Sequence, residues 1–161
     1  MKLDEALGIA NKYVNFLSPF CLRISIAGSI RREKEEIKDI EIVCIPDDLN
    51  GFSEMVNRWK KIKGEPTGKY TQRELPEGIK LDLFMSQEGN WGNILLIRTG
   101  NWQFSKYIVG TKAGQAGLVQ KDGFLWRGNE KINCMEEKDV FDLLKIDYVE
   151  PKNRNEEIYN F

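Results

Sequence analysis

The feature that most constrains the fold of this chain is a change in hydrophobic periodicity along the sequence. Near the N-terminus, apolar residues recur at helical spacing: Leu3, Leu7, Ala10, Val14 and Leu17. This spacing predicts an amphipathic helix over residues 3–17, with its apolar side facing a core. Residues 23–27, 40–45 and 79–85 follow a strand pattern instead. Helix and strand patterns in this order favour the α+β class.

The remaining segments complete the predicted architecture. Residues 52–63 repeat at helical spacing up to Gly64, which predicts a second helix. Later segments predict helices at about 91–98, 102–113 and 136–145, and a hairpin at 117–127 that turns at Asp122-Gly123. The polar tail, residues 148–161, is expected to be loosely ordered.

We therefore expect a small mixed sheet, backed by the helices at 3–17 and 52–63, and then a helical subdomain with a hairpin. No linker, repeat or low-complexity segment divides the chain, so residues 1–88 and 89–161 are expected to be subdomains in contact.

Composition excludes several kinds of chemistry. The chain has 161 residues and no histidine, so it has neither a His-dependent nucleophile nor an HExxH zinc site. Its 24 basic and 25 acidic residues argue against a broad electrostatic grip on nucleic acid. Catalysis would therefore depend on carboxylates, amines, hydroxyls or thiols.

The cellular setting is predicted from what the sequence lacks. Cys21, Cys44 and Cys134 form no CxxC pair and lie among apolar neighbours, which indicates buried, reduced thiols. The N-terminus does not resemble a signal peptide, and no apolar run is long enough to span a bilayer. A soluble, cytoplasmic monomer is the expectation.

Three acidic residues lie on predicted strands. Asp39 and Glu41 are two residues apart, so their carboxylates project to one face at a separation of about 6.6 Å along the strand. Asp82 lies between Leu81 and Leu83 on another strand. If the strands are neighbours, three carboxylates converge, and such a cluster repels itself unless cations occupy it. Oxygen ligands of this kind suit two Mg²⁺ or Mn²⁺ ions that promote phosphoryl transfer.

The alternative is that each acid is only the solvent-side residue of an amphipathic strand. Gly28-Ser29, eleven residues before Asp39, favours the chemical interpretation. A glycine and a serine at a strand-to-helix turn can offer N–H groups and a hydroxyl to a phosphate, and Arg31 and Arg32 follow with positive charge.

Together, these motifs resemble a known family. The run from Gly28 to Arg32 followed by Asp39-Ile40-Glu41 looks like the nucleotidyltransferase superfamily signature, and the double arginine is similar to family X, the DNA polymerase beta-like enzymes. Residues 97–101 with 104–106, and residues 137–142 with 148–154, resemble later segments of the same family. The resemblance covers nearly the whole chain and implies a minimal form with a palm (1–88) and a nucleotide-selecting C-terminal subdomain (89–161).

The resemblance also implies roles for particular residues. Asp39, Glu41 and Asp82 would be the catalytic metal ligands for two Mg²⁺ (or Mn²⁺) ions, with Asp82 near the primer hydroxyl. The incoming nucleotide would be held by Gly28, Ser29, Arg32, Thr99, Gly100, Trp102 and Ser105. Lys106 would face the templating base. The basic run Arg58, Lys60, Lys61 and Lys63 is a further candidate for DNA contact, with a solvated helix face as the equal alternative.

Some positions depart from the family pattern. Glu41 stands where family X usually has aspartate, and Ile97-Arg98 stand where an aromatic residue commonly meets the sugar. Ser105 and Val109 occupy positions that usually supply asparagine and arginine. These departures leave sugar discrimination, fidelity and template dependence open.

Three functions follow from the sequence. The first is a gap-filling DNA polymerase that acts in repair, with gapped or nicked DNA and a deoxynucleoside triphosphate as partners. The second is a nucleotidyltransferase that works without a template or on another acceptor. The third is a DNA-end binding module without catalysis, which the presence of all three acids disfavours.

Overall fold

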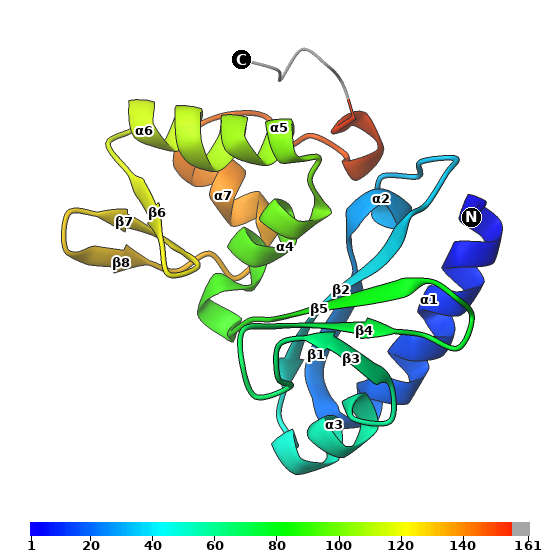
Figure 1. Ribbon diagram of the computed structural model, residues 1–161. Coiled ribbons are helices and arrows are strands. Elements are labelled where there is room, and N and C mark those ends of the chain that lie inside the picture. The colour runs from blue at the N-terminus through cyan, green and yellow to red at the C-terminus, as the bar shows by residue number, and fades with distance from the viewer. Residues whose placement is uncertain (156–161) are drawn as a thin grey trace. The chain divides into compact units, whose positions relative to one another are not determined.

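The computed structural model describes residues 1–155 and divides into two compact units, one from Met1 to Ser86 and one that begins at Gln87. The first unit contains a five-stranded mixed sheet with helices, and the second contains helices and a three-stranded sheet (Figure 1). The α+β class predicted from the sequence is confirmed.

The sheet of the first unit has the strand order β1-β2-β5-β4-β3. Its strands are β1 (Cys21–Ile26), β2 (Asp39–Pro46), β3 (Lys60–Lys63), β4 (Tyr70–Glu74) and β5 (Lys80–Met85). The two central strands, β2 and β5, run parallel, and the other three pairs are antiparallel. The parallel pair is the part of the sheet that carries the candidate acids.

Three helices belong to this unit: α1 (Leu3–Leu17), α2 (Gly28–Arg31) and α3 (Leu49–Val56). The core joins α1 and α3 to Ile40 and Ile42 of β2, both fully buried. Because side chains alternate along a strand, Asp39 and Glu41 lie on the other face of β2. Helices α1 and α3 thus cover one face of β2, and the acids lie on the opposite face.

The helix predicted over 3–17 is confirmed, but its buried side is displaced. The buried residues of α1 are Ala6, Ala10, Tyr13 and Leu17, whereas Leu7 remains 39% exposed. Tyr13 packs edge-on against Trp59, with ring centroids 4.9 Å apart. Two of the buried positions are therefore shifted by one residue: Ala6 is buried in place of Leu7, and Tyr13 is buried in place of Val14.

The helix predicted over 52–63 is wrong in its second half. The α3 helix begins earlier, where Asp48 accepts a hydrogen bond from the Gly51 N–H at 3.0 Å, and it ends at Val56. Lys60–Lys63 instead forms strand β3, which pairs with β4. Local periodicity favours helix here, but hydrogen bonding to a distant strand overrides it.

Strand β4 (Tyr70–Glu74) was not predicted from the sequence. Its buried side chains are Thr71 and Arg73, so the alternation of this strand is polar and gives no hydrophobic signal. Arg73 is 2% exposed and donates to the Trp59 carbonyl at 3.2 Å and to the Thr71 hydroxyl at 3.1 Å. Side chains of β4 become important at the candidate site.

The second unit contains α4 (Trp91–Thr99) and then a continuous helical segment made of α5 (Trp102–Ser105), a π-helical stretch (Lys106–Lys112) and α6 (Ala113–Gln115). Both helices predicted for this region are confirmed. Its sheet contains β6 (Val119–Lys121), β7 (Phe124–Arg127) and β8 (Glu130–Ile132), and α7 (Glu137–Leu144) follows.

The predicted hairpin turn at Asp122-Gly123 is confirmed, with φ angles of 54° and 81°. Two consecutive positive φ values are what a type I′ turn requires, and Asp-Gly is a preferred pair for it. The third strand, β8, was not predicted.

The expectation of a loosely ordered tail is wrong for the part of the tail that the structure describes. Arg154 is fully buried, and Pro151–Asn153 forms a short 3₁₀ helix. Residues 156–161 lie outside the described residues. All three cysteines are free thiols, with Cys44 and Cys134 buried and Cys21 half-buried.

Candidate functional site

The candidate site of the first unit is built on β2 and β5. In their parallel register, Glu41 lies beside Asp82 and Asp39 lies beside Lys80. Asp82 is 7% exposed, while Asp39 and Glu41 are half-buried. The three acids are therefore carried by two neighbouring central strands.

Asp82 is held by two side chains of β4. The Tyr70 hydroxyl and the Gln72 Nε2, at 2.8 Å, both donate to Asp82 Oδ1. Tyr70 in turn stacks on Phe84, with ring centroids 5.0 Å apart. Two donors on one oxygen restrict the orientation of the Asp82 carboxylate. Sequence reasoning missed both residues because β4 was not predicted.

The pKa of Asp39 depends on its burial and on the nearby Asp82 carboxylate. Partial burial, and then the neighbouring Asp82 carboxylate, raise the pKa of Asp39 above its usual value, whereas Lys80 and Lys38 act in the opposite direction. Like charges in a partly buried place disfavour each other. A cation bound beside both carboxylates would relieve this repulsion.

The Glu41 carboxylate lies against Gly28. A Cβ atom built on Gly28 would lie 1.6 Å from Glu41 Oε2, so the carboxylate occupies the space above this glycine. Gly28 has φ +62°, which also favours glycine. Burial lowers the pKa of Arg32 and the charge of Glu41 raises it, so these two side chains interact electrostatically.

The acids are thus divided between two environments. Asp39 and Asp82 influence each other, while the Glu41 carboxylate lies at Gly28. Across residues 1–155, no group of three or more His, Cys, Asp or Glu side chains is arranged so that it could hold a metal ion. The parallel register brings the three positions together, but the side chains do not form a three-ligand cluster.

The predicted phosphate-binding residues surround the start of α2. Gly28 is buried, and Ser29, Arg31 and Arg32 are half-buried. The N–H of Ala27 donates to the Glu41 carbonyl at 2.8 Å, which fixes the start of this turn to β2. Gly28 and Arg32 therefore lie close to Glu41, the second acid of β2.

In the second unit, the turn from Thr99 to Asn101 joins α4 to α5. Thr99 is fully buried, Gly100 has φ 68°, and the peptide bond between Gly100 and Asn101 is cis. Asn101 caps α5, because its side chain accepts a hydrogen bond from the Phe104 N–H at 2.9 Å.

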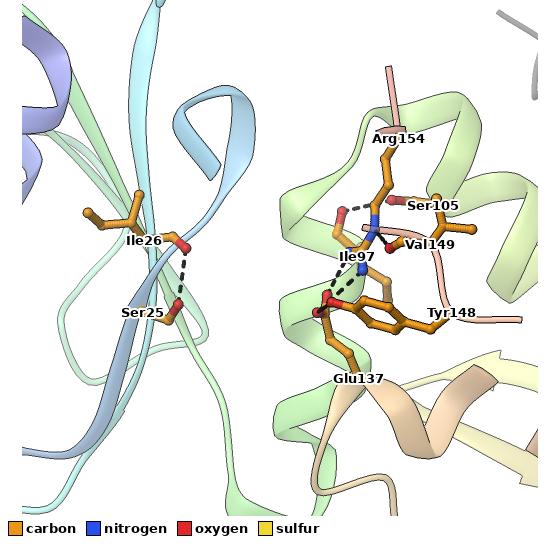
Figure 2. Close-up of polar contacts among 8 residues, drawn as sticks. All are labelled: Ser25, Ile26, Ile97, Ser105, Glu137, Tyr148, Val149 and Arg154. Atoms are coloured by element: carbon orange, nitrogen blue, oxygen red, sulfur yellow. Dashed lines mark hydrogen bonds and ion pairs between the residues drawn. The ribbon is translucent and has the colours of Figure 1, made fainter. Parts of the chain in front are cut away.

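The other predicted residues near this turn differ in accessibility. Trp102 is 67% exposed and Lys106 is exposed, so both side chains can meet a ligand. Ser105 is 7% exposed, and its hydroxyl donates to the Ile97 carbonyl at 2.9 Å. Figure 2 shows this link between α5 and α4. Ser105 thus has a structural contact that its sequence position did not indicate.

The basic run does not lie on a helix, contrary to the sequence interpretation. Arg58, Lys60, Lys61 and Lys63 are exposed, and the last three belong to β3, at one end of the strand order. Lys60 pairs with Glu74 at 2.8 Å, and Lys61 pairs with Glu65. Lys63 Nζ lies 5.5 Å from the centre of the Tyr70 ring. Acidic neighbours therefore offset part of the positive charge expected to contact DNA.

Comparison with known families places the second unit in context. A family model described as the DNA polymerase beta thumb matches residues 94–155. The matched segment runs from α4 to the end of the described tail and includes the Thr99–Asn101 turn. The chain therefore carries an element similar to the thumb of a family X polymerase, which suggests a DNA-binding, polymerase-like function.

A search of curated proteins found no match. None of the helices within residues 1–155 combines the length and the apolar character needed to cross a membrane.

Proposed function

We propose that this chain transfers a nucleotidyl group from a deoxynucleoside triphosphate to a DNA 3′-hydroxyl, as a minimal family X-like polymerase of the gap-filling, repair type. The observation that carries this proposal is the β2–β5 register, which places Glu41 beside Asp82 in a chain that also carries the thumb-like element. In the reaction, the 3′-oxygen bonds to the α-phosphorus, the bond to the β-phosphate breaks, and pyrophosphate leaves.

The donor chemistry at this place fits magnesium or manganese. Asp39 and Asp82 supply carboxylate oxygens without histidine or thiolate, and their mutual repulsion favours a bound cation. We propose that both hold the metal and that Glu41 completes the ligand set for two ions when its carboxylate turns from Gly28. Such ions stabilise the charge that develops on the transferred phosphate.

The chain's own groups would orient the reactants. Asp82, fixed by Tyr70 and Gln72, is the proposed acceptor of the primer hydroxyl proton. Gly28, Ser29 and Arg32 are the proposed triphosphate contacts, since backbone N–H groups and a guanidinium suit phosphate oxygens. In the second unit, Thr99 and Gly100 would meet the sugar, Trp102 the base, and Lys106 the template.

A second candidate function has its own support. The Ser105 hydroxyl is engaged by the Ile97 carbonyl, and Val109 is apolar, so neither offers the polar groups with which family X usually reads the nascent pair. Addition that ignores the template, or that uses another acceptor, is the alternative. A DNA-end binding module without catalysis is the third possibility.

The deciding experiment is primer extension on a gapped duplex with each deoxynucleotide singly, in Mg²⁺ or Mn²⁺. The wild type is compared with Asp39→Asn and with the matched control Glu54→Gln, an exposed acid on α3. Template-matched addition that Asp39→Asn abolishes and Glu54→Gln retains would support the polymerase. Addition regardless of the template would favour the alternative, and equal incorporation by wild type and Asp39→Asn would overturn the site.

A further inference from the structure

A buried ion pair fastens the end of the described chain to the second unit (Figure 2). Arg154 is fully buried, and its partner Glu137, on α7, is 6% exposed. Arg154 Nη1 donates to Glu137 Oε2 at 2.7 Å, and Nη2 donates to Oε1 at 3.4 Å. A third donor, Arg154 Nε, bonds to the Val149 carbonyl at 2.9 Å. This fork-to-carboxylate geometry allows few orientations of the guanidinium.

Aromatic side chains enclose the same guanidinium. The centres of the Phe104, Phe141 and Tyr148 rings lie 5.1, 5.6 and 5.4 Å from Arg154 Cζ. Tyr148 also donates its hydroxyl to Glu137 Oε1 at 3.4 Å. Arg154 thereby contacts side chains of α5, α7 and the tail segment. Hydrogen bonds and ring contacts together fix one position for the side chain and for the backbone that carries it.

The backbone of Arg154 reaches the turn between α4 and α5. The N–H of Asn101 donates to the Arg154 carbonyl at 3.2 Å. The turn is also attached to its own helices, because the Gly100 N–H donates to the Leu96 carbonyl at 3.3 Å and Asn101 caps α5. The Arg154 carbonyl thus attaches the turn to a segment outside these two helices.

We propose that Arg154 is a positioning residue for the Thr99–Asn101 turn. Its side chain, anchored by Glu137, fixes its carbonyl oxygen, which holds the Asn101 N–H and thus the backbone that meets the nucleotide sugar. The inference rests on the proposed function, because it assigns the turn to the nucleotide. It assigns a positioning task to Arg154, whose side chain is fully buried.

The test separates positioning from general stability. Arg154→Met alone leaves Glu137 buried without its partner and endangers folding, so the main variant is Arg154→Met with Glu137→Leu, which removes both charges. Arg154→Lys keeps the charge but loses the fork. The control is Leu125→Ala, a 1% exposed core residue on β7 whose truncation destabilises the same unit.

Two measurements are made on each full-length chain: the KM and kcat for a deoxynucleotide on one gapped duplex, and amide hydrogen exchange at Asn101. We expect the double variant to raise KM about fivefold, the change that corresponds to one net hydrogen bond, with kcat nearly unchanged. Asn101 exchange should accelerate, and Arg154→Lys should be intermediate in both. Leu125→Ala should lower the melting temperature without either change.

The outcomes distinguish the two claims. An unchanged KM or unchanged Asn101 exchange in the double variant would overturn the positioning role, as would an equal rise of KM in Leu125→Ala. A wild-type chain that extends no primer would instead contradict the proposed function and, with it, the nucleotide role of the turn. The exchange data would then still report whether Arg154 holds Asn101.

Discussion

The two units place buried charge in opposite ways. In the first unit, partial burial and then the like charge of Asp82 raise the pKa of Asp39. In the second, Arg154 and Glu137 carry opposite charges and satisfy each other with two hydrogen bonds. Like charges close together in a partly buried place are costly and identify a candidate ligand site, whereas a buried pair of opposite charges that satisfies its hydrogen bonds fixes the local structure. The Asp39–Asp82 pair is therefore part of a candidate reaction site, whereas the Arg154–Glu137 pair stabilises the structure of the second unit.

The largest expected effect comes from neutralising one member of the like-charged pair. Asp39→Asn should reduce primer extension roughly 10³-fold, about 4 kcal/mol of transition-state stabilisation, because it removes a proposed metal ligand. The measurement is single-nucleotide extension at saturating DNA, with DNA affinity followed by fluorescence anisotropy. Glu54→Gln should match the wild type. If Asp39→Asn kept activity within a few-fold of wild type, the Asp39–Asp82 pair would not belong to a reaction site. Its contrast with the Arg154–Glu137 pair would then not hold.

Breaking the Arg154–Glu137 ion pair should lower the stability of the folded chain. Arg154→Met leaves the Glu137 carboxylate buried without its partner and should lower the free energy of unfolding by about 3–5 kcal/mol. Adding Glu137→Leu should restore much of this loss. Urea unfolding of the two variants measures both values. If the single and double variants were equally stable, the pair would not behave as a buried ion pair.

One of the two hydrogen bonds that orient the Asp82 carboxylate can be removed without changing the charge of any side chain. Tyr70→Phe removes one of the two donors to Asp82 Oδ1 but keeps the ring that stacks on Phe84. We expect about a tenfold lower kcat, since a hydrogen bond to a charged group contributes roughly 1.5–3 kcal/mol. The control is Tyr107→Phe on the π-helical stretch. An unchanged kcat for Tyr70→Phe would show that Gln72 alone suffices.

The smallest effect is a dependence of stability on pH. The raised pKa of Asp39 means that the folded chain binds a proton more readily than the unfolded chain. The contribution of Asp39 to the free energy of unfolding is therefore fully present below its pKa in the unfolded chain, which is about 3.9. It is lost as the pH rises through the higher pKa of Asp39 in the folded chain. Because Asp39 is partly exposed, the change is small.

Melting temperatures of wild type and Asp39→Asn between about pH 3 and 7 would measure this contribution. The wild type should lose stability relative to the variant as pH rises through that window, and Mg²⁺ at neutral pH should stabilise the wild type more. Parallel curves for the two proteins would show that the pKa of Asp39 is not raised in the folded chain.

The contrast also shows what sequence patterns can and cannot predict. Strands β2 and β5 were predicted because most of their buried residues are apolar. Strand β4 was not, because it buries Thr71 and Arg73, whose polarity hides the alternation. The donors to Asp82 were missed with it.

The tail was misjudged for a related physical reason. Its sequence is polar, and polar segments usually remain in solvent. The burial of Arg154 depends on Glu137, seventeen residues earlier, and on rings from three elements. These partners surround the Arg154 charge only in the folded chain, so the local sequence pattern does not reveal them. Likewise, the sequence placed three acids together, but it did not indicate that the Glu41 side chain would turn to Gly28.

Strand β3 has a consequence for the behaviour of many copies of the chain. It is a terminal strand of its sheet and presents Lys60, Lys61 and Lys63 around a single exposed isoleucine, Ile62. A terminal strand is a template on which another chain can add, and lysines there disfavour such pairing because they bring like charges together. The same lysines that suggest DNA contact are therefore suited to protecting the chain from edge-to-edge aggregation.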